Sequence, residues 1–168
     1  MLFRSSSVRA LGTQEHQDVI PDLVKALYDS KSQVCKAAAG SLVRIGSAAL
    51  PSLRRVLEAQ DVRVRIAATW AIGKIATWDP EMVPGLLAAI GDSDERLRKS
   101  AQFALESMGE KVAGDVMRAM KKNDNDYVTA CGCSILGNLN MIESTSFLSD
   151  FILHRSEERR VGKECRSR

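Results

Sequence analysis

The feature that most constrains this chain of 168 residues is an internal repeat. Four segments align without gaps, and a fifth copy near the start fits more loosely. The aligned segments cover residues 34–46, 64–76, 97–109 and 128–140, and the looser copy covers residues 3–15. Successive copies begin 31, 30, 33 and 31 positions apart. A period of this length predicts a row of similar structural units, each packed against its neighbours, instead of one central core.

Each aligned segment has the apolar spacing of an amphipathic helix. Large apolar residues stand at the first, ninth and usually twelfth positions, as in Val34, Leu42 and Ile45. Small residues stand at the fourth and fifth positions, as in Ala37 and Ala38. Steps of three and four residues place these side chains on one face of a helix. We expect the small residues to let another helix approach this face closely.

Polar residues mark the expected starts of these helices. Asp61, Asp94 and Asn125 lie three positions before the first apolar residue of their segments, where an N-cap residue is wanted. Lys31 breaks the pattern in the earliest of the four segments, although Ser32 beside it could act as the cap.

A second helix is predicted before each aligned segment. These upstream helices are expected over residues 19–27, 49–57, 82–90 and 112–120. Pro21, Pro51 and Pro84 occupy equivalent positions in three of them, and Gly114 stands at that position in the fourth. Proline is tolerated in the first turn of a helix, so it marks a helix start. The loops that join each upstream helix to its segment are short and polar, which favours antiparallel hairpins whose apolar stripes are buried by stacking.

The pattern P-x-L-x-x-x-L followed by D-x-x-V-R-x-x-A-A-x-x-A-L/I-G resembles HEAT repeats, of the short type first described in phycobilisome lyase subunits. Cys35 and Thr129 depart from it, since the family prefers Arg at their position. The resemblance implies an all-α fold, a right-handed α-solenoid of stacked antiparallel helix pairs with about four repeats. We expect a partial repeat over 1–17, repeats over 18–47, 48–80, 81–110 and 111–141, and a partial repeat over 142–154. These half repeats lead us to expect a piece of a longer array.

Residues 155–168, RSEERRVGKECRSR, resemble the translation of a common sequencing adapter. The resemblance implies a tail that is non-native and disordered; the alternative is a basic arm that contacts nucleic acid or an acidic partner. The whole chain has 24 Lys and Arg against 21 Asp and Glu, and the tail holds six and three of them. Residues 1–154 therefore carry 18 charges of each sign. A neutral body gives no global electrostatic reason to bind nucleic acid or a membrane surface.

The candidate partner-binding site lies on the outward face of the second helices, which line the concave face in HEAT proteins. Trp70 and Phe103 share the seventh position in adjacent repeats, and Ile66 lies one turn before Trp70. Such an aromatic pair within a basic rim has the composition of a binding hot spot. The alternative is that both rings fold down between repeats and only pack. The basic residues expected around the pair are Lys36, Arg44, Lys74 and Lys99.

Other polar residues are interpreted as structural. Arg65 and Arg98 share the second position, and in the family such residues form a ladder between repeats with upstream aspartates, here Asp61 and Asp94. Cys131 and Cys133 are two apart on a helix and point to different faces, so they do not suggest a shared metal and are interpreted as small buried residues.

The leading hypothesis is a non-enzymatic scaffold that binds a protein or peptide on its concave face, without cofactor or metal. We expect it as a monomer or as part of a longer repeat chain. A bilin lyase subunit is an alternative, and a HEAT-like DNA glycosylase is disfavoured by the neutral body. Without Cys165 of the tail, three cysteines remain, and this odd number indicates a reducing compartment, by default the cytoplasm. No apolar run approaches the ~20 residues of a membrane span.

Overall fold

The structure is a computed structural model that describes residues 18–123, 125–139 and 145–154. This part of the chain is all-α and contains no strand. Neither the expected partial repeat over 1–17 nor the tail 155–168 lies within these residues. Residues 145–154 form one helical segment beyond the labelled helices. The labelled helices are α1 (Ile20–Ala26), α2 (Ser32–Ile45), η1 (Gly46–Ala49), α3 (Leu50–Val56), α4 (Val62–Ile75), α5 (Val83–Ile90), α6 (Glu95–Ser107), η2 (Gly109–Val112), α7 (Ala113–Lys122) and α8 (Asp126–Asn138).

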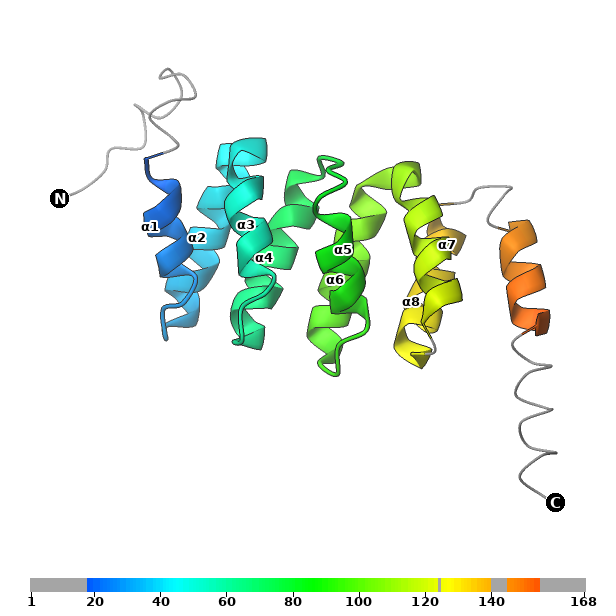
Figure 1. Cartoon of the computed structure of the whole chain (residues 1–168). Coiled ribbons are helices and arrows are strands. Elements are labelled where there is room, and N and C mark those ends of the chain that lie inside the picture. Colours follow the sequence, from blue (N-terminus) through cyan, green and yellow to red (C-terminus); the bar gives the residue numbers. More distant parts are fainter. Residues whose placement is uncertain (1–17, 124, 140–144, 155–168) are drawn as a thin grey trace.

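The helices form two layers that run along one stack axis (Figure 1). The first helix of each pair packs on the second, α1 on α2 through to α7 on α8. The second helices also contact their counterparts in the next repeat, α2 on α4, α4 on α6 and α6 on α8. The predicted α-solenoid of helix pairs is therefore confirmed. No helix of the described residues is long and apolar enough to cross a lipid bilayer.

The predicted helix starts agree with the structure, with one exception. Asp61 and Asp94 are N-cap residues whose carboxylates accept the backbone N–H two residues on, each at 2.8 Å. Asn125 caps α8 in the same way at 2.9 Å. The suggestion that Ser32 caps α2 is wrong, because Ser32 is already the first helical residue and Lys31 is the N-cap. Lys31 has no side-chain acceptor to offer, so α2 begins without a side-chain cap.

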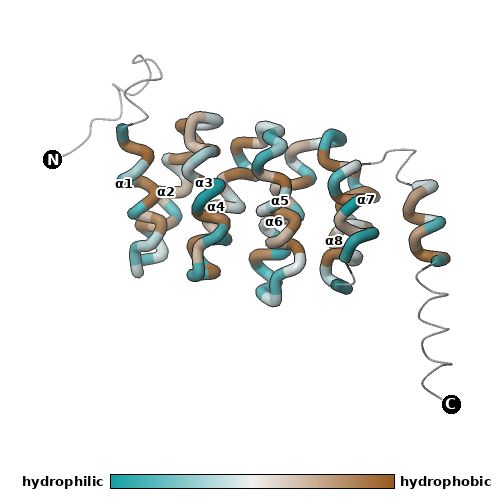
Figure 2. Tube along the Cα trace, viewed as in Figure 1, coloured by the Kyte–Doolittle hydropathy of each residue, from teal (hydrophilic) through white to brown (hydrophobic). Residues whose placement is uncertain are grey.

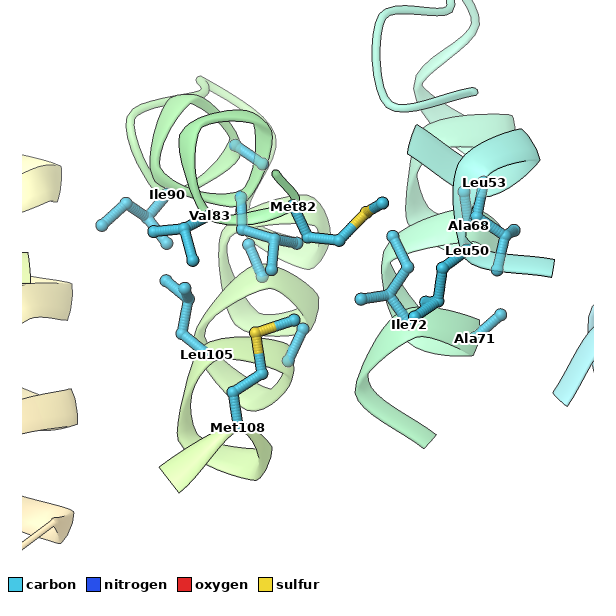
Figure 3. Packing of buried hydrophobic residues seen from close by; sticks show 14 of the residues in the cluster. Leu50, Leu53, Ala68, Ala71, Ile72, Met82, Val83, Ile90, Leu105 and Met108 are labelled. Atoms are coloured by element: carbon cyan, nitrogen blue, oxygen red, sulfur yellow. The ribbon is translucent and has the colours of Figure 1, made fainter. Parts of the chain in front are cut away.

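Apolar side chains from neighbouring repeats share one core. Apolar stretches recur in helices all along the stack (Figure 2). Met82, just before α5, extends across the gap between repeats toward the α3–α4 pair (Figure 3). There it points toward Leu50 and Ile72, and all three residues are buried. A repeat removed from this stack would expose its apolar stripe on both sides.

The small residues of the second helices set the distance between repeats. Ala68 and Ala101, at the fifth position of their segments, are fully buried, as predicted. Gly73 of α4 allows an even closer approach to α6. A Cβ atom at Gly73 would lie 2.8 Å from two ring carbons of Phe103 and 3.0 Å from Cα of Ala104. The Phe103 ring therefore lies against the backbone of α4.

An ion pair joins two neighbouring repeats, from α4 of one to the loop before α6 of the next. The Arg65 guanidinium on α4 lies 2.8 Å from Oδ2 of Asp92, in the loop before α6. The Asp92 carboxylate also accepts the backbone N–H of Asp94 at 2.8 Å. Both side chains of the pair are mostly buried, at 24% and 19% exposure for Arg65 and Asp92. One ion pair of the expected ladder is thus present, between Arg65 and Asp92.

The expected acids of that ladder, Asp61 and Asp94, serve their own helices instead. Each caps its helix and pairs with the arginine two residues on, Arg63 or Arg96. The Arg98 guanidinium donates to two carbonyls of its own loop and lies 3.9 Å from the ring centre of Tyr127. The prediction was wrong here because a cap position directs its carboxylate at the local backbone.

We predict that Gly73→Ala lowers the free energy of unfolding by about 1–3 kcal/mol, because the added methyl group must push back the Phe103 ring and the α6 backbone. Gly137→Ala is the matched control, since Gly137 holds the same repeat position in α8 and has no atom within 4 Å of an added Cβ. That variant should gain about 0.5–1 kcal/mol from helix propensity. Urea unfolding followed by circular dichroism measures both, and equal effects would contradict the close approach.

We also predict a pH-dependent contribution from Asp92. Its pKa is lowered from the ordinary value, first by the Asp94 backbone N–H and then by the Arg65 guanidinium, while burial opposes the shift. A carboxyl with a lower pKa in the folded chain stabilises that state above its ordinary pKa, and the effect is lost as pH falls through the folded-state pKa. Asp92→Asn should cost about 1 kcal/mol at pH 7. Urea unfolding of both proteins should show this difference shrinking in acid; a constant difference would contradict the assignment.

Candidate functional site

A groove of about 750 Å³ opens on the layer of second helices. Its walls come from the first nine residues of α2, α4 and α6, three neighbours in that layer. The apolar residues that line it are Ala39, Val64, Ile66, Ala67, Trp70 and Phe103, and Leu27 at the end of α1 adds to them. The charged residues that line it are Asp29, Lys36, Arg63, Arg96 and Lys99. It is therefore an apolar groove bordered mainly by cations.

The two aromatic residues of the candidate site are part of this groove and remain accessible. Trp70 on α4 is 39% exposed and Phe103 on α6 is 37% exposed. The alternative in which both rings are buried between repeats is thus not what the structure shows. Phe103 does take part in packing, because its ring lies on the α4 backbone at Gly73. Trp70 and Phe103 present apolar surface from adjacent repeats to one groove.

The structure brings most of the predicted site residues together. Lys36, Ile66, Trp70, Lys99 and Phe103 all line the groove. These residues hold the third and seventh positions of their segments, which lie one turn apart on the same face of each helix.

Two predicted residues hold the eleventh position and lie beyond the groove lining. Lys74 places its ammonium nitrogen 5.1 Å from the centre of the Phe103 ring, so it borders the aromatic pair. Arg44 lies in the last turn of α2, where its guanidinium donates to Oγ of Ser41 at 2.9 Å. The groove is lined by the first nine residues of these helices, and Arg44, in the last turn of α2, lies beyond them.

Among the four cations of the groove, the sequence analysis missed two, Arg63 and Arg96. Both lie in the first turn of their helices and line the groove. A signal was present, because Arg63, Ile66 and Trp70 follow one another at steps of three and four residues. The stripe at the third and seventh positions therefore extends one turn toward the helix start.

Three of the four groove cations have carboxylate partners on their own helix or cap. The Arg63 guanidinium lies 2.7 Å from Asp61, and that contact is the main cause of the lowered pKa of Asp61. Arg96 and Asp94 are related in the same way, at 3.2 Å, and the pKa of Asp94 is lowered chiefly by the Arg96 side chain.

The two lysines of the groove differ in their surroundings. The Lys99 ammonium pairs with Glu95 at 2.7 Å, and this hydrogen bond is the main cause of the lowered pKa of Glu95. Lys36 forms no ion pair with any residue that the structure describes. Among the groove cations, Lys36 is therefore the one whose charge has no compensating carboxylate in the described chain.

The groove contains one thiol, that of Cys35. Burial raises the pKa of Cys35, so at neutral pH the group is the weakly nucleophilic thiol. Cys131 and Cys133 lie half-buried on α8, outside the groove lining. Within residues 18–123, 125–139 and 145–154, no three His, Cys, Asp or Glu side chains gather closely enough to hold a metal ion. The groove residues can contact apolar side chains of a ligand and pair with its charged groups.

The chain was compared with known families, curated sequences and solved structures. A family model of HEAT repeats matches residues 2–73 and again residues 51–134. The comparison with curated protein sequences gives no match.

Two similar solved structures are designed armadillo repeat proteins. One, in complex with the peptide (KR)4, is 18% identical over 88% of this chain and 78% of its own, with a TM-score of 0.51. The other is 18% identical over 83% of this chain and 75% of its own, with a TM-score of 0.48. At such identity the first likeness shows a shared α-solenoid fold. The two matched segments of the HEAT repeat model together span most of the sequence, and the chain belongs to the HEAT repeat family.

Proposed function

We propose that this chain is a non-enzymatic scaffold that binds a short segment of a protein partner in the groove on α2, α4 and α6. One observation carries the proposal. Trp70 and Phe103, on adjacent repeats, each keep more than a third of their surface exposed in one groove, whose centre is apolar and whose border is charged. Exposed aromatic residues that converge on one hollow are the side chains that most often dominate the energy of a protein interface.

The size and lining of the groove support a peptide as its ligand. A volume of about 750 Å³ lies within the range of pockets that enclose small ligands or a few side chains. The related fold of the designed armadillo repeat protein is found in complex with a peptide, (KR)4. That likeness supports the same general use here, with a sequence preference set by this chain's own residues.

The surroundings of the groove support a binding role in place of catalysis. Its one thiol, Cys35, has a raised pKa, and no histidine is among the residues that line the groove. General base catalysis needs a group of suitable pKa within hydrogen-bond reach of a nucleophile, and the one carboxylate of the lining, that of Asp29, accepts the backbone N–H of Lys31. The odd number of cysteines in the described chain, three, supports a reducing compartment such as the cytoplasm.

The repeat length supports a finer family assignment. Spacings of 30 to 33 residues suit the short HEAT-like type named after phycobilisome lyase subunits. That assignment is compatible with both a scaffold and a lyase subunit, and a coloured adduct after addition of bilin to the purified chain would identify the latter.

We predict that Trp70→Ala combined with Phe103→Ala weakens peptide binding at least about tenfold, because two anchors of the groove are removed. A ligand can be selected from a displayed peptide library on the purified chain, and its affinity measured by fluorescence anisotropy. Trp78→Ala is the matched control. Trp78 is 38% exposed and has a lysine ammonium, that of Lys111, 5.0 Å from its ring centre, yet it is not part of the groove.

Trp70→Ala alone is a necessary second variant, because Phe103 also packs against α4. Unchanged helical circular dichroism would show that either variant is folded. Equal affinity of the wild-type and the folded double variant, or a loss caused by Trp78→Ala, would remove the groove as the binding site.

A further inference from the structure

The third positions of three neighbouring second helices place unlike side chains across the groove. They are Lys36 on α2, Ile66 on α4 and Lys99 on α6, and all three line it. Trp70 stands one turn after Ile66 and widens the apolar centre. A segment that crosses the helices in this order would therefore meet a cation, an apolar surface and a second cation.

The spacing of the helices sets the length of such a segment. Packed helices lie ~8–10 Å apart, so the backbones that carry Lys36 and Lys99 are separated by ~16–20 Å. An extended peptide advances ~3.3 Å per residue and turns every second side chain to the same face, so six residues span ~20 Å. Side chains i and i+6 can then reach the two lysines, while i+2 and i+4 lie over Ile66 and Trp70.

The charges of the groove favour acidic side chains at the two outer positions. Its lining contains four cations and one carboxylate, that of Asp29, which already accepts the backbone N–H of Lys31 at 2.7 Å. Lys36 has no ion pair in the described chain. The Lys99–Glu95 pair lies in solvent, where such a pair contributes little and exchanges readily. A carboxylate is attracted at both ends of the groove, and a basic side chain is repelled.

The same residues disfavour a nucleic acid strand. A continuous row of phosphates needs several unpaired cations, whereas Asp61, Asp94 and Glu95 already pair with three of the four cations in the groove. The centre of the groove also contains the aliphatic Ile66 beside Trp70, which contacts an apolar side chain better than it stacks on a base.

We propose that the groove selects an extended peptide of the form acidic-x-apolar-x-apolar-x-acidic, with Lys36 and Lys99 reading the two acidic side chains. The proposal rests on the proposed function and adds the chemical class of the ligand. The apolar pair supplies contact area over Ile66 and Trp70 of α4, and the acidic pair sets the register and excludes basic segments.

Three labelled nonapeptides test this preference by fluorescence anisotropy with the full chain. SESLSFSES has the proposed spacing, and SKSLSFSKS reverses its charges. LESSSSSEF has the composition and acidic spacing of the first peptide, but its apolar residues are moved to the ends. We expect SESLSFSES to bind about tenfold or more tighter than either of the others at physiological salt.

Charge reversal on the protein completes the test. Lys36→Glu combined with Lys99→Glu should invert the order, so that SKSLSFSKS binds tighter than SESLSFSES. Arg55→Glu combined with Lys122→Glu is the matched control, because it changes the net charge equally on the exposed side of α3 and α7 and should leave the order intact. The basic tail is present in every protein compared, so its attraction for acidic peptides is the same in each, and the change of order between variants reports on the groove.

Several outcomes would overturn the proposal. Equal or tighter binding of SKSLSFSKS to the unaltered chain contradicts the charge preference. Inversion of the affinity order of the two peptides by the control variant, Arg55→Glu with Lys122→Glu, contradicts it as well. No binding of SESLSFSES contradicts it too. If the library-selected peptide is still lost with the Trp70 and Phe103 substitutions, the proposed function stands without this specificity. Displacement of SESLSFSES by oligo(dT) at lower concentration than by the unlabelled peptide would assign the groove to nucleic acid.

Discussion

The structure depends on one constraint: a single helix pair of this chain cannot bury its own apolar stripe. Met82 extends out of its repeat toward Leu50 and Ile72 of the preceding one, and all three are buried only because the two repeats touch. Stability in such a stack is approximately a sum of contributions from repeats and from the contacts between nearest neighbours. The even layer of second helices follows from this requirement, and so does the groove that three of them form.

Much of this architecture could be predicted because its signals are local. The cap aspartates, the prolines in first turns and the small residues at the fourth and fifth positions each act within one helix or one pair. What the sequence did not reveal depends on distances between repeats. Asp92 in the Arg65 ion pair and the Phe103 ring on Gly73 are examples, because these contacts follow from how far one helix is rotated and shifted against the next.

The groove joins rigid and adjustable parts. Its apolar wall is held by packed helices, and the Phe103 ring is fixed against Gly73 on one side. Its charged border consists of long side chains whose ion pairs with Asp61, Asp94 and Glu95 lie near the surface and are individually weak. A partner would thus meet a preformed shape, which lowers the entropic cost of binding, and a border whose charges can be shared with it.

The contact between Gly73 and Phe103 has an evolutionary consequence. A ring that separates two repeats and also faces the groove is subject to two selective pressures at once. A bulkier residue at position 73 is compatible only with a smaller side chain at position 103, so the two positions should change together across related arrays. Diversification of ligand preference at position 103 is then coupled to the geometry of the stack, and a new specificity there requires a compensating substitution on the neighbouring helix.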